Sequence, residues 1–530
     1  MIRIYNVVGV LFIFLLTSCS EDYLNRPPLG IQTEDNFYDS PGAAFKMVTN
    51  CYLGFYDFWG YQAALAELGN MATDESEKGG SDAGDRPFVA DLGFGRTLSS
   101  NETLSNFWSA CYKAIGNCNV ALDNLPEAEL LDDDGNLLEE SKEKRYLAEI
   151  RFLRSYFYFD LVRVFGGVPL ITTTPSVDDR DRIERARSEE IFNFIESEWT
   201  EIADDLPSKG EMSDSELGRV SKEAVWAFLA KAYLFFADGK IEYYEKARDF
   251  AKKVIDSEQF KLENNYQDLW LQEGYKSDES IFMVIFGDDP GSFIYGSTLP
   301  VYCSPRSVGG WGFDCLTQSL VDEFEDGDSR RLFTVLDDGD IFPTRSGGQE
   351  KLDFSVSPGT GYYNRKVFLI DGRRGQGWGD DEWTLYLMRY SDVLLMYAEA
   401  LLESGGNHEE IVEYINKVRM RVNQSDNEDV EAIDRKFIVS GTLSMVDVSD
   451  DLRTAIRHER RVEFGGEYHR LFDLIRWGNY VTTMHDFSKK PYSNGRGSAF
   501  KESSGSRYVF PIPQVEIDRS GGSITQNPGY

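Results

Sequence analysis

Histidine is scarce in this chain of 530 residues, which contains only four. The one His-Glu pair, His458-Glu459, continues as Arg460-Arg461-Val462 and so does not complete the HExxH motif of zinc enzymes. The chain also lacks a CxxC pair and any cluster of cysteine and histidine with the spacing of a zinc site. The sequence therefore predicts neither a metal site nor a cofactor, and it singles out no catalytic residue.

Basic residues are also few, since 55 lysines and arginines stand against 90 aspartates and glutamates, for a formal net charge of -35. A surface of that charge repels the phosphate backbone of nucleic acid, so we expect no nucleic-acid partner. Neutral sugars are indifferent to the charge, whereas a polyanionic glycan needs a local basic patch. Arg373-Arg374 is the only obvious basic pair in a loop-like stretch, and we expect it to lie on a solvated surface.

Long apolar runs are absent beyond the N-terminus, and the run over residues 7–16 is too short to span a bilayer. With Arg3 before it and two small residues and Cys19 after it, this run has the layout of a secretory signal. A cysteine directly after small residues is typical of a bacterial lipobox. Residues 1–18 are therefore predicted to be a lipoprotein signal peptide, and Cys19 is predicted to carry the lipid that anchors the protein. The alternative is a plain signal peptide with a chance cysteine.

Cysteine is used sparingly, with six in the chain including Cys19. The other cysteines are odd in number, so at least one stays unpaired. Cys111 and Cys118 lie seven positions apart in a helical pattern, which places them about 10 Å apart along the axis, too far for a disulfide. Cys303 and Cys315 lie in a loop-like region, and the sequence leaves open whether they pair.

Apolar residues recur every three or four positions over several long segments, which predicts amphipathic helices. The clearest covers residues 141–165 and is stopped by Gly166-Gly167. The others are predicted over residues 106–125, 221–236, 241–255, 385–403, 409–422 and 451–477. The middle four form two helix pairs with small residues at closely packing positions, as in tetratricopeptide repeats. The sequence thus predicts a mainly α fold with a tetratricopeptide-like helical scaffold, mainly residues 41–258 and 385–478.

Helical periodicity fades between residues 260 and 384, where glycine, aspartate, proline and aromatic residues accumulate. A short strand is predicted over residues 280–286. Recognition residues concentrate on loops that a rigid scaffold holds. This irregular, loop-rich half with a few short strands is therefore predicted to bind the ligand.

Aromatic residues next to glycine in loops suit a sugar ligand, because a sugar ring has apolar C–H faces and a rim of hydroxyls that bond to polar side chains. The predicted ligand-binding residues are Trp311, Phe313 and Tyr302, then Arg86, Phe88 and Phe94 in the nonhelical stretch before residue 101, and then Trp378 and Trp383. The alternative for each is a place in a local hydrophobic cluster. Trp108, Trp226 and Trp477 lie on helical faces and are predicted to be core residues.

Two charged segments are predicted to be structural. Residues 457–463 carry opposite charges three or four positions apart on a helix, a spacing that forms ion pairs. Residues 337–340 offer carboxylate oxygens but lack the full spacing of an EF-hand, which favours a solvated turn over a calcium site.

Several short motifs occur in a fixed order along nearly the whole chain. Residues 151–170 read RFLRSYFYFDLVRVFGGVPL, and residues 467–478 read EYHRLFDLIRWG. The other motifs cover residues 218–222, 389–400, 459–464, 510–513 and 526–530. In this order they resemble the SusD/RagB family of nutrient-binding outer-membrane lipoproteins. Tyr468 departs from the pattern, because the family often has glycine before the His-Arg pair, and this puts only the local packing in doubt.

The resemblance implies tetratricopeptide-like helices that support a ligand-binding half within one domain, residues 19–530. It implies a lipid-anchored protein at the surface of the outer membrane. This protein would capture an oligosaccharide or polysaccharide without breaking a bond, and its partner would be a SusC-like TonB-dependent transporter. Two alternatives stay open: a surface glycoside hydrolase, whose paired carboxylates a sequence cannot reveal, and a helical-repeat lipoprotein that binds protein or peptide.

Overall fold

The computed structural model describes residues 37–38, 40–176, 183–287, 295–356, 359–374, 379–425, 428–500 and 507–530. The predicted signal peptide, Cys19 and Trp378 lie outside these ranges. Within them, no helix combines the length and the apolar character that crossing a bilayer requires.

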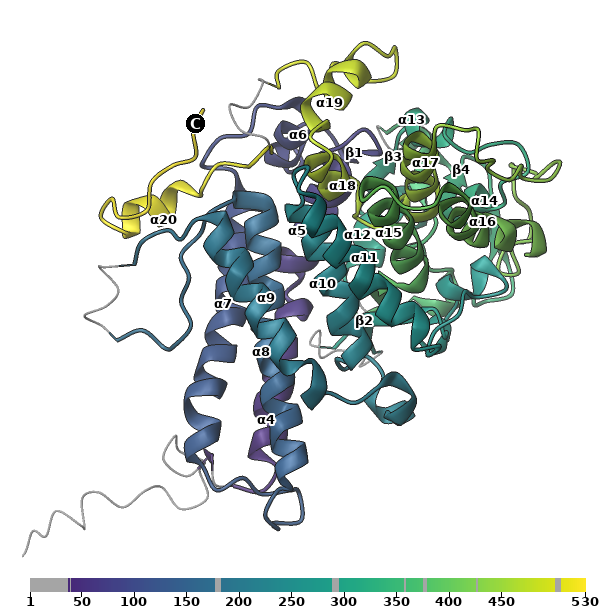
Figure 1. Cartoon of the computed structure of the whole chain (residues 1–530). Coiled ribbons are helices and arrows are strands. Elements are labelled where there is room, and N and C mark those ends of the chain that lie inside the picture. The colour runs from purple at the N-terminus through teal and green to yellow at the C-terminus, as the bar shows by residue number, and fades with distance from the viewer. Residues whose placement is uncertain are drawn as a thin grey trace, which may run out of the picture.

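Long helices that pack side by side build the N-terminal half (Figure 1). Local sequence signals set their ends. Asn101 caps one helix by accepting a hydrogen bond from the backbone N–H of Leu104, and Gly166 ends another with a φ of 71°. The long helices of this half are α4 (Ala43–Tyr52), α7 (Glu102–Asn124), α8 (Glu140–Phe165), α9 (Ser188–Ile202), α10 (Lys222–Phe236) and α11 (Ile241–Asp256).

Further helices follow in the C-terminal half. They are α15 (Tyr390–Glu403), α16 (His408–Gln424), α17 (Leu452–Phe464), α18 (Arg470–Arg476), α19 (Tyr480–Ser488) and α20 (Gln514–Arg519). The pair α10–α11 packs next to the pair α15–α16, because α11 contacts α15 along its length, and α17 then packs on α15 (Figure 1). The predicted mainly α fold with a tetratricopeptide-like scaffold is confirmed.

Two predicted helices were wrong in part. Residues 385–389, assigned to a helix from the sequence, belong to strand β8 (Trp383–Arg389). This strand pairs antiparallel with β2 (Ser280–Phe286), the strand that the sequence did predict. Residues 385–388 are buried on both faces, so their apolar run carries no alternation that would separate strand from helix.

The second correction concerns residues 451–477, which form two helices rather than one. Helix α17 ends at Phe464, and Gly466 and Tyr468 then adopt positive φ angles of 79° and 70° before α18 begins. The backbone N–H of Tyr468 donates to Asn70 Oδ1 at 3.0 Å, so a tertiary contact holds the break in place.

Short elements fill the region between the helical halves. The strands β1 (Ser76–Gly79), β3 (Phe313–Leu316), β7 (Tyr362–Asn364) and β4 (Val335–Asp337) form an antiparallel sheet in that order, and β5 (Ile341–Pro343) pairs with β6 (Gln349–Lys351). The short helices are α5 (Ala63–Ala66), α6 (Pro87–Phe94), α12 (Leu299–Cys303), α13 (Gln318–Val321) and α14 (Arg330–Thr334). The pairing of β1 with β3 brings the N-terminal half against the loop-rich half.

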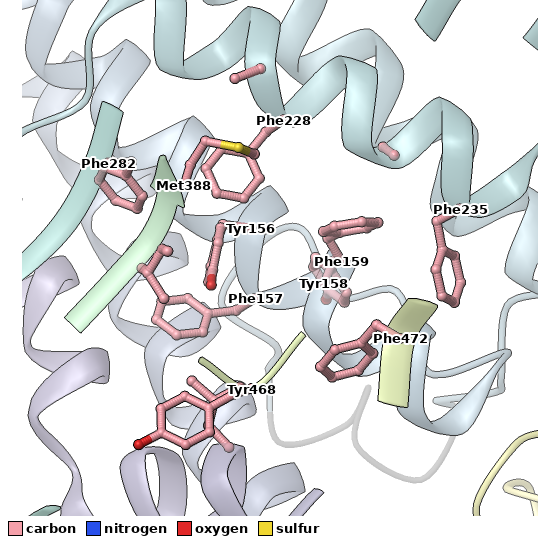
Figure 2. Packing of buried hydrophobic residues seen from close by; sticks show 14 of the residues in the cluster. Tyr156, Phe157, Tyr158, Phe159, Phe228, Phe235, Phe282, Met388, Tyr468 and Phe472 are labelled. Carbon is pink, nitrogen blue, oxygen red and sulfur yellow. The ribbon is translucent and has the colours of Figure 1, made fainter. Parts of the chain in front are cut away.

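Aromatic residues fill the centre of the core, as Figure 2 shows. Tyr156 of α8 packs edge-on against Phe228 of α10 at 5.3 Å between ring centroids, and Phe228 packs against Phe282 of β2 at 5.9 Å. Such pairs add about 0.5–1.5 kcal/mol beyond the burial of their area. The motif at residues 151–170 therefore supplies the residues on which both halves pack.

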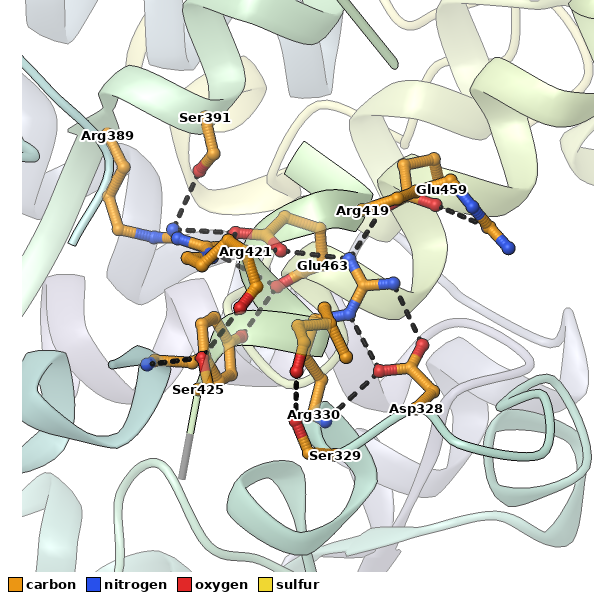
Figure 3. A network of polar contacts seen from close by, with 12 residues as sticks. Asp328, Ser329, Arg330, Arg389, Ser391, Arg419, Arg421, Ser425, Glu459 and Glu463 are labelled. Atoms are coloured by element: carbon orange, nitrogen blue, oxygen red, sulfur yellow. Dashed lines mark hydrogen bonds and ion pairs between the residues drawn. The ribbon is translucent and has the colours of Figure 1, made fainter. Parts of the chain in front are cut away.

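A network of buried ion pairs links the C-terminal helices to the loops (Figure 3). Glu463 of α17 accepts hydrogen bonds from Arg421 at 2.6 Å, Arg389 at 2.9 Å and Arg330 at 3.0 Å. Burial opposes its charge, but the three guanidinium groups hold the pKa of Glu463 well below its usual range. The structural role predicted for residues 457–463 is confirmed, although the pairs reach other elements rather than running along the helix.

Residues 67–76 are fixed by residues that follow about 400 positions later in the chain. Arg470 pairs with Asp74 at 2.9 Å, across a separation of 396 positions. The Nη2 atom of Arg496 donates to the carbonyl oxygens of Met71, Thr73 and Ser76 at 2.6–2.8 Å, and Arg496 is 425 positions from Met71. This segment is therefore held from the C-terminal half.

Two further expectations are decided by burial. The turn over residues 337–340 is solvated only in part: Asp338 is exposed, but Asp340 is fully buried, pairs with Arg435 at 3.0 Å and accepts hydrogen bonds from the backbone N–H groups of Asp337 and Lys436. Among the described residues, no group of histidine, cysteine, aspartate and glutamate is arranged to hold a metal ion. Cys303 and Cys315 are both buried free thiols, so they do not form the disulfide that the sequence left open.

Candidate functional site

An exposed tryptophan, Trp59, lies on a one-turn π-helix at residues 58–62. Asp57 caps this turn by accepting a hydrogen bond from Gly60 N at 2.9 Å. A side chain at position 60 would bring its Cβ within 2.6 Å of the Ala110 Cβ on α7, so glycine lets the turn lie against that helix. Trp59 is left 44% exposed. Single π-turns in proteins are found frequently at functional sites.

A glycine-rich loop brings Trp311 to the same place. The backbone N–H of Trp311 donates to Val301 O at 2.8 Å, and that of Gly312 donates to Ser304 O at 2.9 Å, so the loop folds back over α12. A Cβ at Gly310 would lie 2.1 Å from Ser304 O, and Gly312 has a φ of 80°. Both glycines are therefore required by this backbone path.

Together these segments form a cluster that we call the aromatic platform, which consists of Phe58, Trp59, Arg86, Phe88, Tyr302, Trp311 and Phe313. Trp59 and Trp311 lie nearly parallel, with ring centroids 5.8 Å apart and an interplanar angle of 22°. The guanidinium of Arg86 lies 4.5 Å from the Trp59 ring and 4.7 Å from the Phe88 ring. Trp59 is exposed and Phe58, Phe88 and Trp311 are half-buried, whereas Tyr302 and Phe313 are buried and stack on each other with ring centroids 4.4 Å apart.

A buried carboxylate holds the platform from below. Glu67 accepts hydrogen bonds from Arg86 Nη2 at 2.5 Å, from the Tyr302 hydroxyl at 2.7 Å and from the Thr103 hydroxyl at 2.5 Å. Burial raises the pKa of Glu67, although its three donors oppose the shift. The ion pair balances the charge of Arg86, so the pair adds no net charge to a surface that combines flat apolar rings with hydrogen-bond donors.

The predicted ligand-binding residues have different locations. Five of the eight lie in the platform: Arg86, Phe88, Tyr302, Trp311 and Phe313. Phe88 and Phe94 lie on helix α6, so the stretch before residue 101 is not nonhelical as predicted. Phe94 is half-buried and carries the Arg96 guanidinium over its ring at 4.3 Å, and none of the ring contacts among the described residues joins it to the platform. Trp383 is buried and stacks on Phe286 at 6.2 Å. Trp378 lies outside the described residues.

Sequence reasoning missed Trp59, which is the most exposed ring of the platform. A signal was available, because Trp59 precedes a glycine in a short aromatic run, as Trp311 does. Among the tryptophans predicted to be core, Trp108 is buried, but Trp226 and Trp477 are only half-buried.

The basic pair in the loops is not the solvated surface that the sequence suggested. Arg373 pairs with Glu431 at 3.0 Å, and Arg374 pairs with Glu350 at 2.8 Å. Both guanidinium charges are therefore balanced by carboxylates, and this pair does not form a basic patch for a polyanionic ligand.

Comparison with known families agrees with the fold and the motif order. The model of the SusD family matches residues 278–530, and a second model, described as starch-binding and associating with the outer membrane, matches residues 84–234. SusD-like protein P2 of Formosa agariphila is 26% identical over 558 aligned positions, which cover 99% of each chain. The starch-binding protein SusD of Bacteroides thetaiotaomicron is 24% identical over 73% of each chain.

Solved structures share the architecture. A laminarin-binding SusD-like protein superposes with a TM-score of 0.72 and 25% identity, covering 92% of this chain and 99% of that one. Surface glycan-binding protein A from Bacteroides thetaiotaomicron, solved in complex with laminarihexaose, has a TM-score of 0.72 and 21% identity over 91% of this chain and 98% of its own. The second likeness concerns the fold alone.

Proposed function

We propose, from the premise that the chain belongs to the SusD-like family, that it captures an oligosaccharide or polysaccharide at the cell surface and passes it to a SusC-like TonB-dependent transporter. The observation that carries this proposal is the near-parallel pair Trp59 and Trp311, with Arg86 at its edge. The protein binds its ligand without breaking a bond, and it is not an enzyme.

Binding follows from the surface that the platform offers. One sugar ring lies with an apolar C–H face on the exposed indole of Trp59, which the near-parallel ring of Trp311 supports. The sugar hydroxyls accept hydrogen bonds from the guanidinium of Arg86, which Glu67 holds in place. Because the Arg86–Glu67 pair has no net charge, the platform favours neutral glycans over polyanionic ones.

Anchoring and transport complete the proposal. Cys19 carries the lipid that holds the protein on the outer membrane. The family model that matches residues 84–234, which is described as associating with the outer membrane, supports the location. Replacing Cys19 with serine should abolish labelling by palmitate and release the protein from the membrane fraction. Co-purification with a TonB-dependent transporter tests the partner, and its absence in mild detergent would count against delivery.

Native affinity electrophoresis tests the central claim. The chain without residues 1–19 is run through gels that contain plant, host or microbial polysaccharides, and reducing ends are assayed in parallel. Retardation by one polysaccharide without release of reducing ends is the expected result. Release of reducing ends would assign a glycoside hydrolase instead, and the lack of retardation by every polysaccharide would favour a peptide or protein ligand.

A further inference from the structure

A second arginine, Arg306, lies beside the aromatic platform, at the loop that carries Trp311. It begins the short 3₁₀ turn Arg306–Val308, directly before that loop, and its side chain is exposed. Its Nη1 atom donates a hydrogen bond to Trp311 O at 3.1 Å. A Cβ at Gly312 would lie 2.9 Å from Cγ of Arg306, so the glycine leaves the space in which the aliphatic part of this side chain lies. The guanidinium is therefore held against the platform loop.

The backbone of this turn is fixed by two neighbouring segments. Val308 O accepts a hydrogen bond from Arg374 Nη1 at 3.0 Å, and that guanidinium is itself held by an ion pair with a carboxylate of β6 at 2.8 Å. Ser307 Oγ accepts a hydrogen bond from the backbone N–H of Asp353 at 3.2 Å. A ligand-binding group on a fixed backbone loses less conformational entropy when the ligand binds, which favours affinity. Arg306 is thus an exposed side chain on a rigid turn.

Arg306 differs from Arg86 because it has no carboxylate partner. Arg86 pairs with Glu67 at 2.5 Å, and both arginines of the basic pair in the loops are balanced in the same way. Among the described residues, no carboxylate lies within ion-pair distance of Arg306, and Trp311 O is the one acceptor that its guanidinium reaches. Exposed donors of this kind bond to water, which the oxygens of a ligand can replace. Most N–H donors of Arg306 are therefore available to a ligand on the platform.

The shape and the charge of the surroundings define the ligand group. A planar guanidinium donates two parallel hydrogen bonds, so it binds a pair of oxygen atoms at a fixed spacing. Neighbouring hydroxyls of a sugar ring present such a pair, as does a carboxylate or a sulfate. Asp353 adds an exposed carboxylate beside the turn of Arg306, and the whole chain has a formal net charge of -35, which disfavours an anionic group. A neutral pair of hydroxyls is therefore expected at this guanidinium.

We propose that Arg306 is a ligand-binding residue of the platform, where it binds two neighbouring hydroxyls of the sugar unit next to the unit on Trp59. This inference rests on the proposed function and adds selectivity to the same site. Trp311 contacts both residues, since its ring lies 5.8 Å from the Trp59 ring and its carbonyl oxygen binds Arg306. Full affinity therefore requires a pair of linked sugar units, and the arrangement of hydroxyls on the second unit decides which glycan is bound.

Calorimetric titration with oligosaccharides of increasing length tests this assignment. The chain without residues 1–19 is titrated with fragments of the polysaccharide that retards it in gels, and binding of the methyl glycoside of a single unit is followed by nuclear magnetic resonance. Arg306→Ala should weaken the disaccharide and every longer ligand about tenfold and leave the methyl glycoside unchanged. Arg306→Lys should recover only part of that loss, because an ammonium group keeps the charge but not the pair of parallel donors.

Arg457→Ala is the matched control. Arg457 also has no carboxylate within ion-pair distance in the described part of the chain, but it lies over the Trp477 ring at 4.8 Å, outside the platform. This variant should bind every ligand as the parent does, and all variants should show a cooperative thermal transition.

Three results would overturn the inference. The first is parent affinity of Arg306→Ala at every length, and the second is full affinity of Arg306→Lys. The third is tighter binding of a glycan with a uronate or a sulfate on the second unit than of its neutral counterpart, because the site would then prefer an anion. The proposed function is tested separately by Trp59→Ala, which should weaken binding at every length. If Trp59→Ala and Arg306→Ala both bind as the parent does, the platform is not the glycan site.

Discussion

Replacing Trp59 with alanine should weaken glycan binding about tenfold. Trp59 is 44% exposed, and 44% of a tryptophan surface of about 250 Å² is about 110 Å². A sugar ring covers one face of the indole, about half of that area, and at about 25 cal/mol per Å² this contact contributes about 1.4 kcal/mol. A change of that size corresponds to about a tenfold increase in Kd.

Calorimetric titration with the polysaccharide or oligosaccharide that retards the protein in gels measures this effect. Trp226→Ala is the matched control, because Trp226 is a half-buried tryptophan on α10 that lies beside Lys253 and outside the platform. Trp226→Ala should bind like the parent protein, and both variants should show a cooperative thermal transition. Unchanged affinity of a folded Trp59→Ala protein would falsify the assignment of the platform as the glycan site.

Three further variants test the structural reasoning. Glu463→Gln removes the carboxylate that Arg330, Arg389 and Arg421 share, so the buried cluster loses one negative charge although each guanidinium keeps another carboxylate partner. The variant should lower the free energy of unfolding by about 3–5 kcal/mol, as measured with urea; a change below about 1 kcal/mol would contradict this expectation. His458 lies between Glu323 and Glu325, and although burial opposes its charge, their hydrogen bonds raise its pKa from 6.5 to about 9. This raised pKa stabilises the fold fully below about pH 6.5, and the stabilisation is lost as the pH rises through about 9. The free energy of unfolding of His458→Gln should therefore be lower than that of the parent at pH 6 and equal to it above pH 10. Parallel profiles of unfolding free energy against pH for the two proteins would refute this. Glu67→Gln should weaken glycan binding while the fold persists, because Arg86 loses the charge that positions it; full affinity would show that Arg86 needs no such support.

The sequence predicts the long helices well, whether one face is buried, as in α11 and α16, or nearly the whole circumference, as in α8 and α10. The segments that became α8, α10, α11 and α16 have uninterrupted periodicity and clear stop signals, and their bounds agree with the predictions to within two residues. Strand β8 was missed because it is buried on both faces, which removes the alternation that reveals a strand. The break after α17 falls at Gly465-Gly466, a local stop signal that the prediction overlooked, and the hydrogen bond between Tyr468 and Asn70 then holds it in place.

The candidate site was predicted only in part, because its residues come together through tertiary contacts that the local sequence does not show. The prediction of aromatic residues near glycines named Trp311 and the group around Arg86, but it did not place them in one cluster. Trp59 follows a helix and sits on a π-turn that exists because Gly60 packs on α7, so its exposure is a tertiary property. The resemblance to a family predicted the architecture and gave no residues of the binding surface, since none of its motifs covers the loops that form the platform.

The anchoring of residues 67–76 by residues more than 390 positions later has a consequence for when the chain can fold. Contacts of such long sequence separation form slowly. The carbonyl groups of this segment cannot accept hydrogen bonds from Arg496 until nearly the whole chain has been synthesised. A partly synthesised chain therefore cannot form the hydrogen bonds that fix residues 67–76. The contacts of Arg496 with this segment are therefore expected to form late in folding rather than in an early nucleus.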